Sequence, residues 1–238
     1  MIDEDYTKDD HINRENDLYA LLKYELTLEY LEKFGLNSIN KNRILNIGCG
    51  AGDFNLIAHS QNYSCDGFDS DSLAIDIAID KNVGLDNRII LSDIETATHM
   101  FSNYDYLVCH DVLEHIENDK FQIKKIKSFC NPINSVIVIS VPAFQFLFGQ
   151  HDVKLGHYRR YSRKQITDLI KDDFEILDSR YVGFLGFFAV FLISKLFKSK
   201  FPSNGNKLGR FILKLTSLVE KKVRFPLGSS VMVVGRIK

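Results

Sequence analysis

Short apolar runs alternate with stretches of helical spacing along the middle of the chain. Six such runs predict β-strands, at residues 44–47, 63–69, 88–91, 104–109, 135–141 and 174–179. Between them, apolar residues at helical spacing predict helices near residues 56–58, 73–79, 119–129 and 162–170. Strands that alternate with helices are typical of an α/β domain with a parallel sheet and right-handed crossovers.

The two ends of the chain carry patterns of another kind. A broad apolar face over residues 16–34 predicts a helix that ends at Gly35. Residues 181–194 are uncharged and rich in phenylalanine, residues 195–207 form a basic linker, and an amphipathic stripe covers residues 208–219. Because a bilayer span needs about 20 apolar residues, we expect the phenylalanine-rich segment to be buried, re-entrant or interfacial.

Length and charge limit the class of protein. The chain has 238 residues, of which 45% are hydrophobic and 26% charged, and this predicts one α/β domain with an insertion. Its formal net charge of -1 hides an asymmetry, because residues 1–17 are acidic whereas residues 195–238 hold eleven bases and one acid. We expect the C-terminal part to contact an anionic partner. Long apolar runs interrupt the bases, which argues against nucleic acid.

The cysteines and the first residues indicate the compartment. The four cysteines show no CxxC spacing and lie in apolar or strand-like contexts, as expected for reduced thiols. The acidic start at residues 1–5 lacks the positive region and apolar core of a secretory signal. We therefore expect a cytoplasmic protein.

A candidate ligand site follows the first two predicted strands. Gly48, Gly50 and Gly52 come directly after the first strand, and glycine allows a positive φ and a close approach of the backbone to a ligand. Asp69 ends the second strand, about 20 residues after the glycine turn. At this separation a dinucleotide-binding fold places an acid that binds ribose hydroxyls. The alternative for the glycines is a turn that only packs a helix onto the sheet. The alternative for Asp69 is an acid at a solvated strand end with no ligand. The GxGxG spacing differs from the GxGxxG of a pyrophosphate site and disfavours nicotinamide dinucleotides.

These motifs, with Asp93 after the third strand and residues 111–116 after the fourth, resemble class I S-adenosylmethionine-dependent methyltransferases. The resemblance covers residues 44–163 and a terminal strand at 230–235. It implies S-adenosylmethionine as cofactor and a Rossmann-like, doubly wound, mostly parallel seven-stranded sheet with an antiparallel last strand and a helical insertion before it. The implied cofactor contacts are Asn46, where the family commonly has an acid, and Gly48, Cys49, Gly50, Gly52, Asp69, Ser70, Asp93, Ile94, His110, Asp111, Val112 and His115.

A histidine-rich segment at residues 150–162 is the candidate catalytic element. It resembles a stretch of bacterial methyltransferases that are associated with cell-surface glycan or lipid pathways. A hydroxyl acceptor needs a base, and histidine is the usual base near neutral pH. We therefore predict that His151 and His157 are catalytic candidates and that Asp152 orients an imidazole.

Two further sets of polar residues are candidates for ligand contacts. The residues predicted to bind the substrate are Arg159, Arg160 and Tyr161. For the two arginines the alternative is ion pairs with nearby acids. No metal is expected. The alternative is that Asp111, Glu114 and His115 bind a magnesium or manganese ion. A similar cluster binds a divalent cation in some quinone O-methyltransferases.

The expected organisation has three parts. Residues 1–35 form an N-terminal helical cap, residues 36–181 and 227–238 bind the cofactor, and residues 182–226 form an apolar and basic helical insertion. The insertion is interpreted as a substrate cap, a homodimer interface or an element on an anionic membrane surface. The leading hypothesis is O-methylation of a small-molecule, glycan or lipid-linked acceptor. The alternatives are a quinone or polyprenyl methyltransferase at the membrane and a non-catalytic membrane-binding protein that retains the fold.

Overall fold

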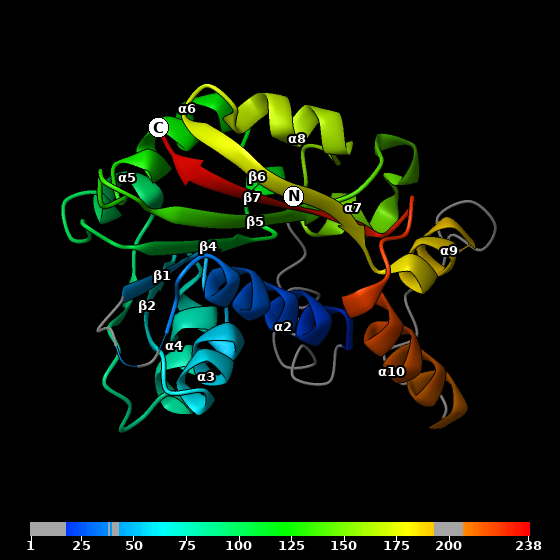
Figure 1. Ribbon diagram of the computed structural model, residues 1–238, viewed down its shortest axis with the longest axis horizontal. Coiled ribbons are helices and arrows are strands. Elements are labelled where there is room, and N and C mark those ends of the chain that lie inside the picture. The colour runs from blue at the N-terminus through cyan, green and yellow to red at the C-terminus, as the bar shows by residue number, and fades with distance from the viewer. Residues whose placement is uncertain (1–17, 38, 40–42, 193–206) are drawn as a thin grey trace.

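A computed structural model of the protein describes residues 18–37, 39, 43–192 and 207–238 (Figure 1). The acidic residues 1–17 and nearly all of the basic linker expected at 195–207 lie outside the described residues. The helix expected at 16–34 is present as α2 (Leu18–Lys33). It ends at Lys33, two residues before Gly35, whose φ of 106° is typical of a glycine that follows a helix.

The strands form a single seven-stranded sheet in the order β3-β2-β1-β4-β5-β7-β6. The first five strands pair in parallel, whereas β7 is antiparallel to both of its neighbours. The strand order reverses between β1 and β4, and the carboxyl ends of strands at such a point form the usual ligand crevice of an open α/β sheet. The expected fold class is confirmed. The strand bounds are β1 (Arg43–Ile47), β2 (Ser64–Asp69), β3 (Ile89–Leu91), β4 (Tyr106–His110), β5 (Val136–Pro142), β6 (Phe174–Val182) and β7 (Ser230–Ile237).

Helices cover both faces of the sheet (Figure 1). One face carries α2, α3 (Asp53–Ser60) and α4 (Ser72–Lys81), and the other carries α5 (Ile94–Ala97), α6 (Asp119–Lys127) and α8 (Arg163–Ile170). Each face has its own hydrophobic core. All seven residues of β5 are buried, as expected for a parallel strand between two helical layers.

The helix α2 belongs to one of these two cores. Its side chains Leu28 and Leu31 are buried in the same cluster as Val136 and Val138 of β5. The apolar face that predicts this helix is therefore packed on the centre of the sheet.

Between β6 and β7, at the position expected for the insertion, the structure describes two helices within residues 184–192 and 207–222. They are α9 (Phe184–Leu192) and α10 (Lys207–Lys222), and both extend beyond one end of the sheet (Figure 1). Glu220 accepts hydrogen bonds from the backbone N–H groups of Gly183 at 2.7 Å and Phe184 at 2.9 Å, which links α10 to the start of α9. No helix in the described part of the chain combines the length and the apolar character that a membrane span needs.

Candidate active site

The glycine turn after β1 has a left-handed backbone at all three glycines. Gly48, Gly50 and Gly52 have φ values of 68°, 52° and 76°, which residues with a Cβ rarely adopt. A Cβ on Gly48 would lie 2.3 Å from Cγ2 of Val112, and a Cβ on Gly52 would lie 2.6 Å from Nδ2 of Asn82. The turn therefore packs closely against the loop after β4 and against the end of α4.

Asp69, at the end of β2, is bonded directly to this turn. Its Oδ2 accepts a hydrogen bond from the N–H of Gly50 at 2.8 Å, and its Oδ1 accepts one from the N–H of Asp71 at 2.9 Å. Each carboxylate oxygen has two lone pairs, so Asp69 retains capacity to accept hydrogen bonds from a ligand. The exposed Ser70 comes next in the chain.

The acid after β3 begins a short helix. Asp93 accepts a hydrogen bond from the N–H of Thr96 at 2.7 Å as the N-cap of α5, and hydrogen bonds from Thr96 lower the pKa of its carboxyl. Asp93 is exposed and the adjacent Ile94 is half-buried, at the carboxyl end of β3. The predicted contact of this pair with an adenine ring stays a prediction.

Asn46 and Cys49 are two of the predicted cofactor residues whose side chains are buried. Asn46 donates a hydrogen bond to Asn55 at 2.7 Å, and Asn55 donates to the carbonyl of Cys65 at 2.8 Å, which fastens α3 to the sheet. Cys49 is also buried, and burial raises the pKa of its thiol. The side chain of Asn46 is therefore occupied in holding the turn in position.

The loop after β4 is fixed by α2. Nε2 of His110 lies 3.0 Å from Oγ1 of Thr27, and its Nδ1 lies 2.8 Å from Oγ of Ser140. Asp111 has a left-handed φ of 53° and forms an ion pair with Lys23. Such a backbone conformation in a residue with a Cβ is costly and is typical of functional sites.

Sequence reasoning missed the two α2 residues in these contacts, Lys23 and Thr27. Both are buried and lie four positions apart on the helix. Polar residues at this spacing on a broadly apolar helix are the only sequence signal that would have found them.

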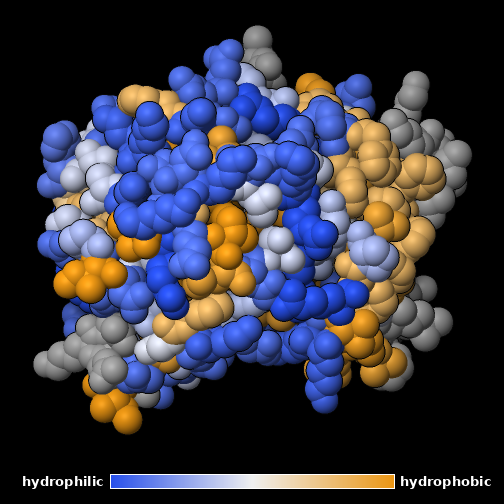
Figure 2. Space-filling view, turned by 45° about the horizontal axis from the view of Figure 1, so that its top comes forward, coloured by the Kyte–Doolittle hydropathy of each residue, from blue (hydrophilic) through white to orange (hydrophobic). Residues whose placement is uncertain are grey.

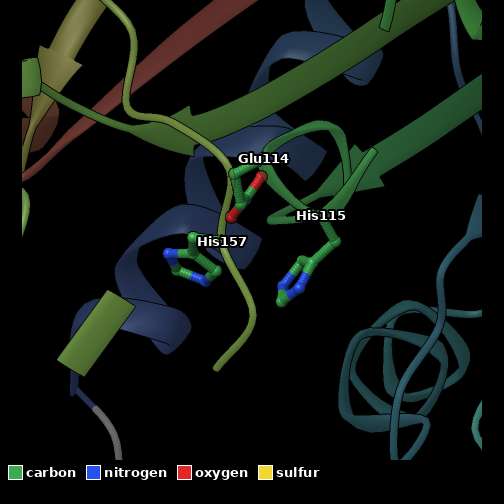
Figure 3. Close-up of side chains that lie close together, drawn as sticks. All are labelled: Glu114, His115 and His157. Carbon is green, nitrogen blue, oxygen red and sulfur yellow. The ribbon is translucent and has the colours of Figure 1, made fainter. Parts of the chain in front are cut away.

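The histidine-rich segment meets the same loop at a cluster of three side chains (Figure 3). Glu114, His115 and His157 each offer one ligand atom, and these atoms lie within 4.8 Å of one another. The rings of His115 and His157 meet edge to face with centroids 4.6 Å apart. The N–H of Tyr158 donates to the carbonyl of Glu114 at 2.7 Å, which joins the two segments. Asp111 lies outside this cluster.

Asp152 holds the imidazole of His157. Its Oδ1 lies 2.8 Å from Nδ1 of His157 and accepts a hydrogen bond from Nε of Arg160, also at 2.8 Å. Burial alone would raise the pKa of Asp152, but the hydrogen bond with His157 and the charge and hydrogen bond of Arg160 lower it to about 2. Asp152 is therefore a buried carboxylate at neutral pH.

The remaining predicted residues of this segment pair within the chain. Arg159 donates to Asp119 at 2.9 Å, Arg160 is buried against Asp152, and the hydroxyl of Tyr161 donates to Asp119 at 2.9 Å. Burial, together with Asp119, raises the pKa of Tyr161. These contacts match the alternative of ion pairs for the arginines, and a direct substrate contact stays a prediction. His151 is half-buried on the short helix α7 (Gln150–Lys154).

The turn suits a ligand without a phosphate. In a pyrophosphate site, backbone N–H groups of the glycine turn bind phosphate oxygens. Here the N–H of Gly50 is bonded to the carboxylate of Asp69, whose negative charge would repel a phosphate. S-adenosylmethionine carries a ribose diol and a positive sulfonium, and both are compatible with a carboxylate at this edge.

The fold is that of class I S-adenosylmethionine-dependent methyltransferases. A methyltransferase-domain family matches residues 18–174, more than half of the chain. The chain therefore belongs to this methyltransferase family, and its cofactor is S-adenosylmethionine. Among curated proteins, none matches the chain.

Solved structures share the fold at low sequence identity. A TehB-like S-adenosylmethionine-dependent methyltransferase from Corynebacterium glutamicum is 15% identical, with a TM-score of 0.58 over 98% of this chain and 99% of its own. The plantazolicin methyltransferase BpumL, solved with S-adenosylhomocysteine, is 18% identical, with a TM-score of 0.61 over 97% and 88%. The cyclase SpnF is 16% identical, with a TM-score of 0.60 over 90% and 81%.

Proposed function

We propose that the chain transfers the methyl group of S-adenosylmethionine to a hydroxyl oxygen of a small-molecule acceptor. The observation that carries this proposal is the pair of Asp152 and His157 beside the loop that packs on the glycine turn. Because ionised Asp152 only accepts hydrogen bonds, Nδ1 of His157 carries the proton between them. Nε2 of the neutral imidazole then has a lone pair for the proton of an acceptor.

The roles of the residues follow from this arrangement. The cofactor supplies a methyl group on a positively charged sulfur, and the protein contributes orientation and exclusion of water. His157 accepts the hydroxyl proton, and Asp152 holds the ring and stabilises its protonated form. Asp69 and the glycine turn hold the cofactor, and Lys23 fixes the loop between the two sites through Asp111.

The insertion supports an acceptor with an apolar part. α9 and the second half of α10, from residue 215 on, carry exposed apolar side chains, and Figure 2 shows a broad hydrophobic area on the side of the molecule where these helices lie. Phe144, just after β5, packs edge to face on Phe187 of α9 with centroids 5.5 Å apart, so this surface begins near the carboxyl edge of the sheet. The exposed members are Phe188, Phe191, Leu215, Leu218 and Val219.

The acceptor in this proposal is therefore lipid-linked or has an apolar tail. A glycan fits this proposal as the polar part of such an acceptor. Residues 182–226 receive it, residues 36–181 and 227–238 bind the cofactor, and α2 within residues 1–35 covers the site. The same apolar surface favours a second candidate, a quinone or polyprenyl methyltransferase that works at a membrane.

Methyl transfer from labelled S-adenosylmethionine tests the proposal. The purified protein is incubated with separate sets of quinols, polyprenyl-linked sugars and amines, and the products are identified by mass spectrometry. We expect a methyl ether and an equal amount of S-adenosylhomocysteine. Label on an amine nitrogen would contradict O-methylation, and no transfer to any acceptor would favour a protein that retains the fold without this activity.

Variants of the two histidines identify the base. We expect His157→Ala to lower kcat by about 10²- to 10⁴-fold, the usual contribution of a general base, with unchanged affinity for S-adenosylhomocysteine. His151→Ala tests the other candidate, and His59→Ala, at an exposed position on α3, is the matched control. Near-normal turnover in both His157→Ala and His151→Ala would contradict the assignment of a histidine base.

A further inference from the structure

We propose that Glu114, His115 and His157 bind one divalent transition-metal ion. Their ligand atoms lie within 4.8 Å of one another, and the two imidazole rings stand at 88° with centroids 4.6 Å apart. Figure 3 shows the three side chains converging from two separate segments. The cluster offers two nitrogen donors and one oxygen donor, and two of its residues lie just after the carboxyl end of β4.

Both segments are held in position before any ion binds. Glu114 and His115 lie in a short 3-10 turn, Leu113–His115, directly after β4. The hydroxyl of Tyr161, which donates mainly to Asp119, lies 3.2 Å from the carbonyl oxygen of Leu113. The N–H of Tyr158 donates to the carbonyl of Glu114 at 2.7 Å. The ligands therefore need only small movements of their side chains to close on an ion.

Asp152 prepares His157 to act as a ligand. A histidine that binds a metal usually donates its other N–H to a carboxylate, which fixes the tautomer and the ring orientation. Nδ1 of His157 makes this contact with Asp152 at 2.8 Å, so Nε2 is the nitrogen that can bind an ion. Arg160 shares the same oxygen of Asp152 and balances its charge.

The donor set indicates the kind of ion. Two imidazoles and one carboxylate suit zinc, cobalt or manganese, whereas magnesium prefers oxygen ligands and retains its waters. Glu114 is fully buried, and the attraction between a carboxylate and a cation is stronger in such a low-dielectric setting. His115 is exposed, so one side of the ion would stay open for a substrate oxygen.

The purpose of the ion rests on the proposed function, although its binding does not. An acceptor hydroxyl bound to the ion is more acidic. Its O–H bond breaks with the electron pair left on oxygen, and the proton passes to water while His157 remains a ligand. Because the lone pair of Nε2 then binds the ion, water replaces His157 as the proton acceptor in the metal-loaded protein, whereas in the metal-free protein His157 keeps the role of base.

Titration of metal-stripped protein with Co²⁺ tests the site, because Co²⁺ in a four- or five-coordinate protein site absorbs visible light much more strongly than hydrated Co²⁺ does. We expect one Co²⁺ per chain, displaced by Zn²⁺ and not by Mg²⁺ at the same concentration. His115→Ala and His157→Ala should each weaken Co²⁺ binding by more than about tenfold, because loss of only a hydrogen-bond partner of a metal ligand already costs about 10- to 100-fold. His115 is exposed, so its variant is expected to fold even if variants at the buried Glu114 do not.

The matched control is His99→Ala, at an exposed histidine outside the cluster, and it should bind Co²⁺ like the parent protein. Visible absorption no stronger than that of hydrated Co²⁺, or equal affinity in parent, His115→Ala and His157→Ala, would overturn the inference. Methyl transfer by the metal-stripped protein separates the two proposals. Transfer without Co²⁺ binding would leave only the metal site refuted, and Co²⁺ binding without formation of a methyl ether would refute only the proposed function.

Discussion

Replacement of Gly48 by alanine perturbs the contact between the glycine turn and the loop after β4. The left-handed backbone of Gly48 costs alanine about 1–2 kcal/mol. The new Cβ would also lie 2.3 Å from Cγ2 of Val112, and overpacking of this kind costs about 1–3 kcal/mol. We therefore expect Gly48→Ala to lower the free energy of unfolding by about 2–5 kcal/mol.

Two controls separate the contributions. Gly84 also has a left-handed φ, of 81°, but within the described structure a Cβ there would meet no atom within 4 Å. Gly84→Ala should therefore cost only the backbone term of about 1–2 kcal/mol. Val112→Ala removes the atom that clashes, so the double-mutant cycle of Gly48→Ala with Val112→Ala should show a favourable coupling of about 1–3 kcal/mol.

Urea denaturation measures these stabilities, and calorimetric titration with S-adenosylhomocysteine measures the effect on the cofactor. Gly48→Ala should weaken cofactor binding, whereas Gly84→Ala should leave it unchanged. The reasoning is refuted if Gly48→Ala is no more destabilising than Gly84→Ala. It is also refuted if Gly48→Ala lowers the free energy of unfolding by the same amount with Val112→Ala present as without it.

Three further predictions concern other parts of the molecule. Asp152→Asn should cost about 2 kcal/mol at pH 7, because the pKa of Asp152 falls from 3.8 to about 2 on folding; urea titrations should show the difference shrinking as the pH falls from about 4 towards 2. Glu220→Gln removes a carboxylate that accepts two backbone hydrogen bonds at the start of α9. Amide hydrogen exchange at the start of α9 should therefore become faster by about tenfold. An equal acceleration of exchange throughout the protein would contradict a local role of Glu220. All four cysteines are buried with raised thiol pKa values, so iodoacetamide should label them only after unfolding; rapid labelling of the native protein would be inconsistent with this burial.

The sheet and most helices could be predicted from the sequence because their signals are local. Strands such as β5, buried on both faces, appear as continuous apolar runs, and Gly35 marks the end of α2. The bounds of a strand were less predictable where hydrogen-bond pairing with a neighbouring strand determines its length. The expected sixth strand at 174–179 continues to Val182, because β7 pairs with it as far as Ser230.

The helix α7 was not predicted, and the reason lies in tertiary contacts. Its five residues, Gln150–Lys154, are too short to show a helical period. Asp152 within it accepts hydrogen bonds from the N–H of Gly149 and from Arg160. A contact between residues eight positions apart through a buried side chain leaves no periodic signal in the sequence.

The individual residues of the candidate site could be predicted from the sequence, but the contacts between them could not. The sequence indicates the glycine turn and Asp69, and the structure joins them by a hydrogen bond. It also indicates both His115 and His157, but the proximity of their rings depends on how two loops fold over one sheet edge. Lys23 reaches Asp111 across the fold, which no local pattern reveals.

An experimental structure with S-adenosylhomocysteine bound tests the central claim most directly. The account predicts that the ribose hydroxyls lie within hydrogen-bond distance of Asp69 and that the methionine end lies on the turn at residues 48–52. It also predicts that the sulfur faces the cluster of Glu114, His115 and His157. A ligand bound away from the turn, or a sulfur that faces away from His157, would contradict the account.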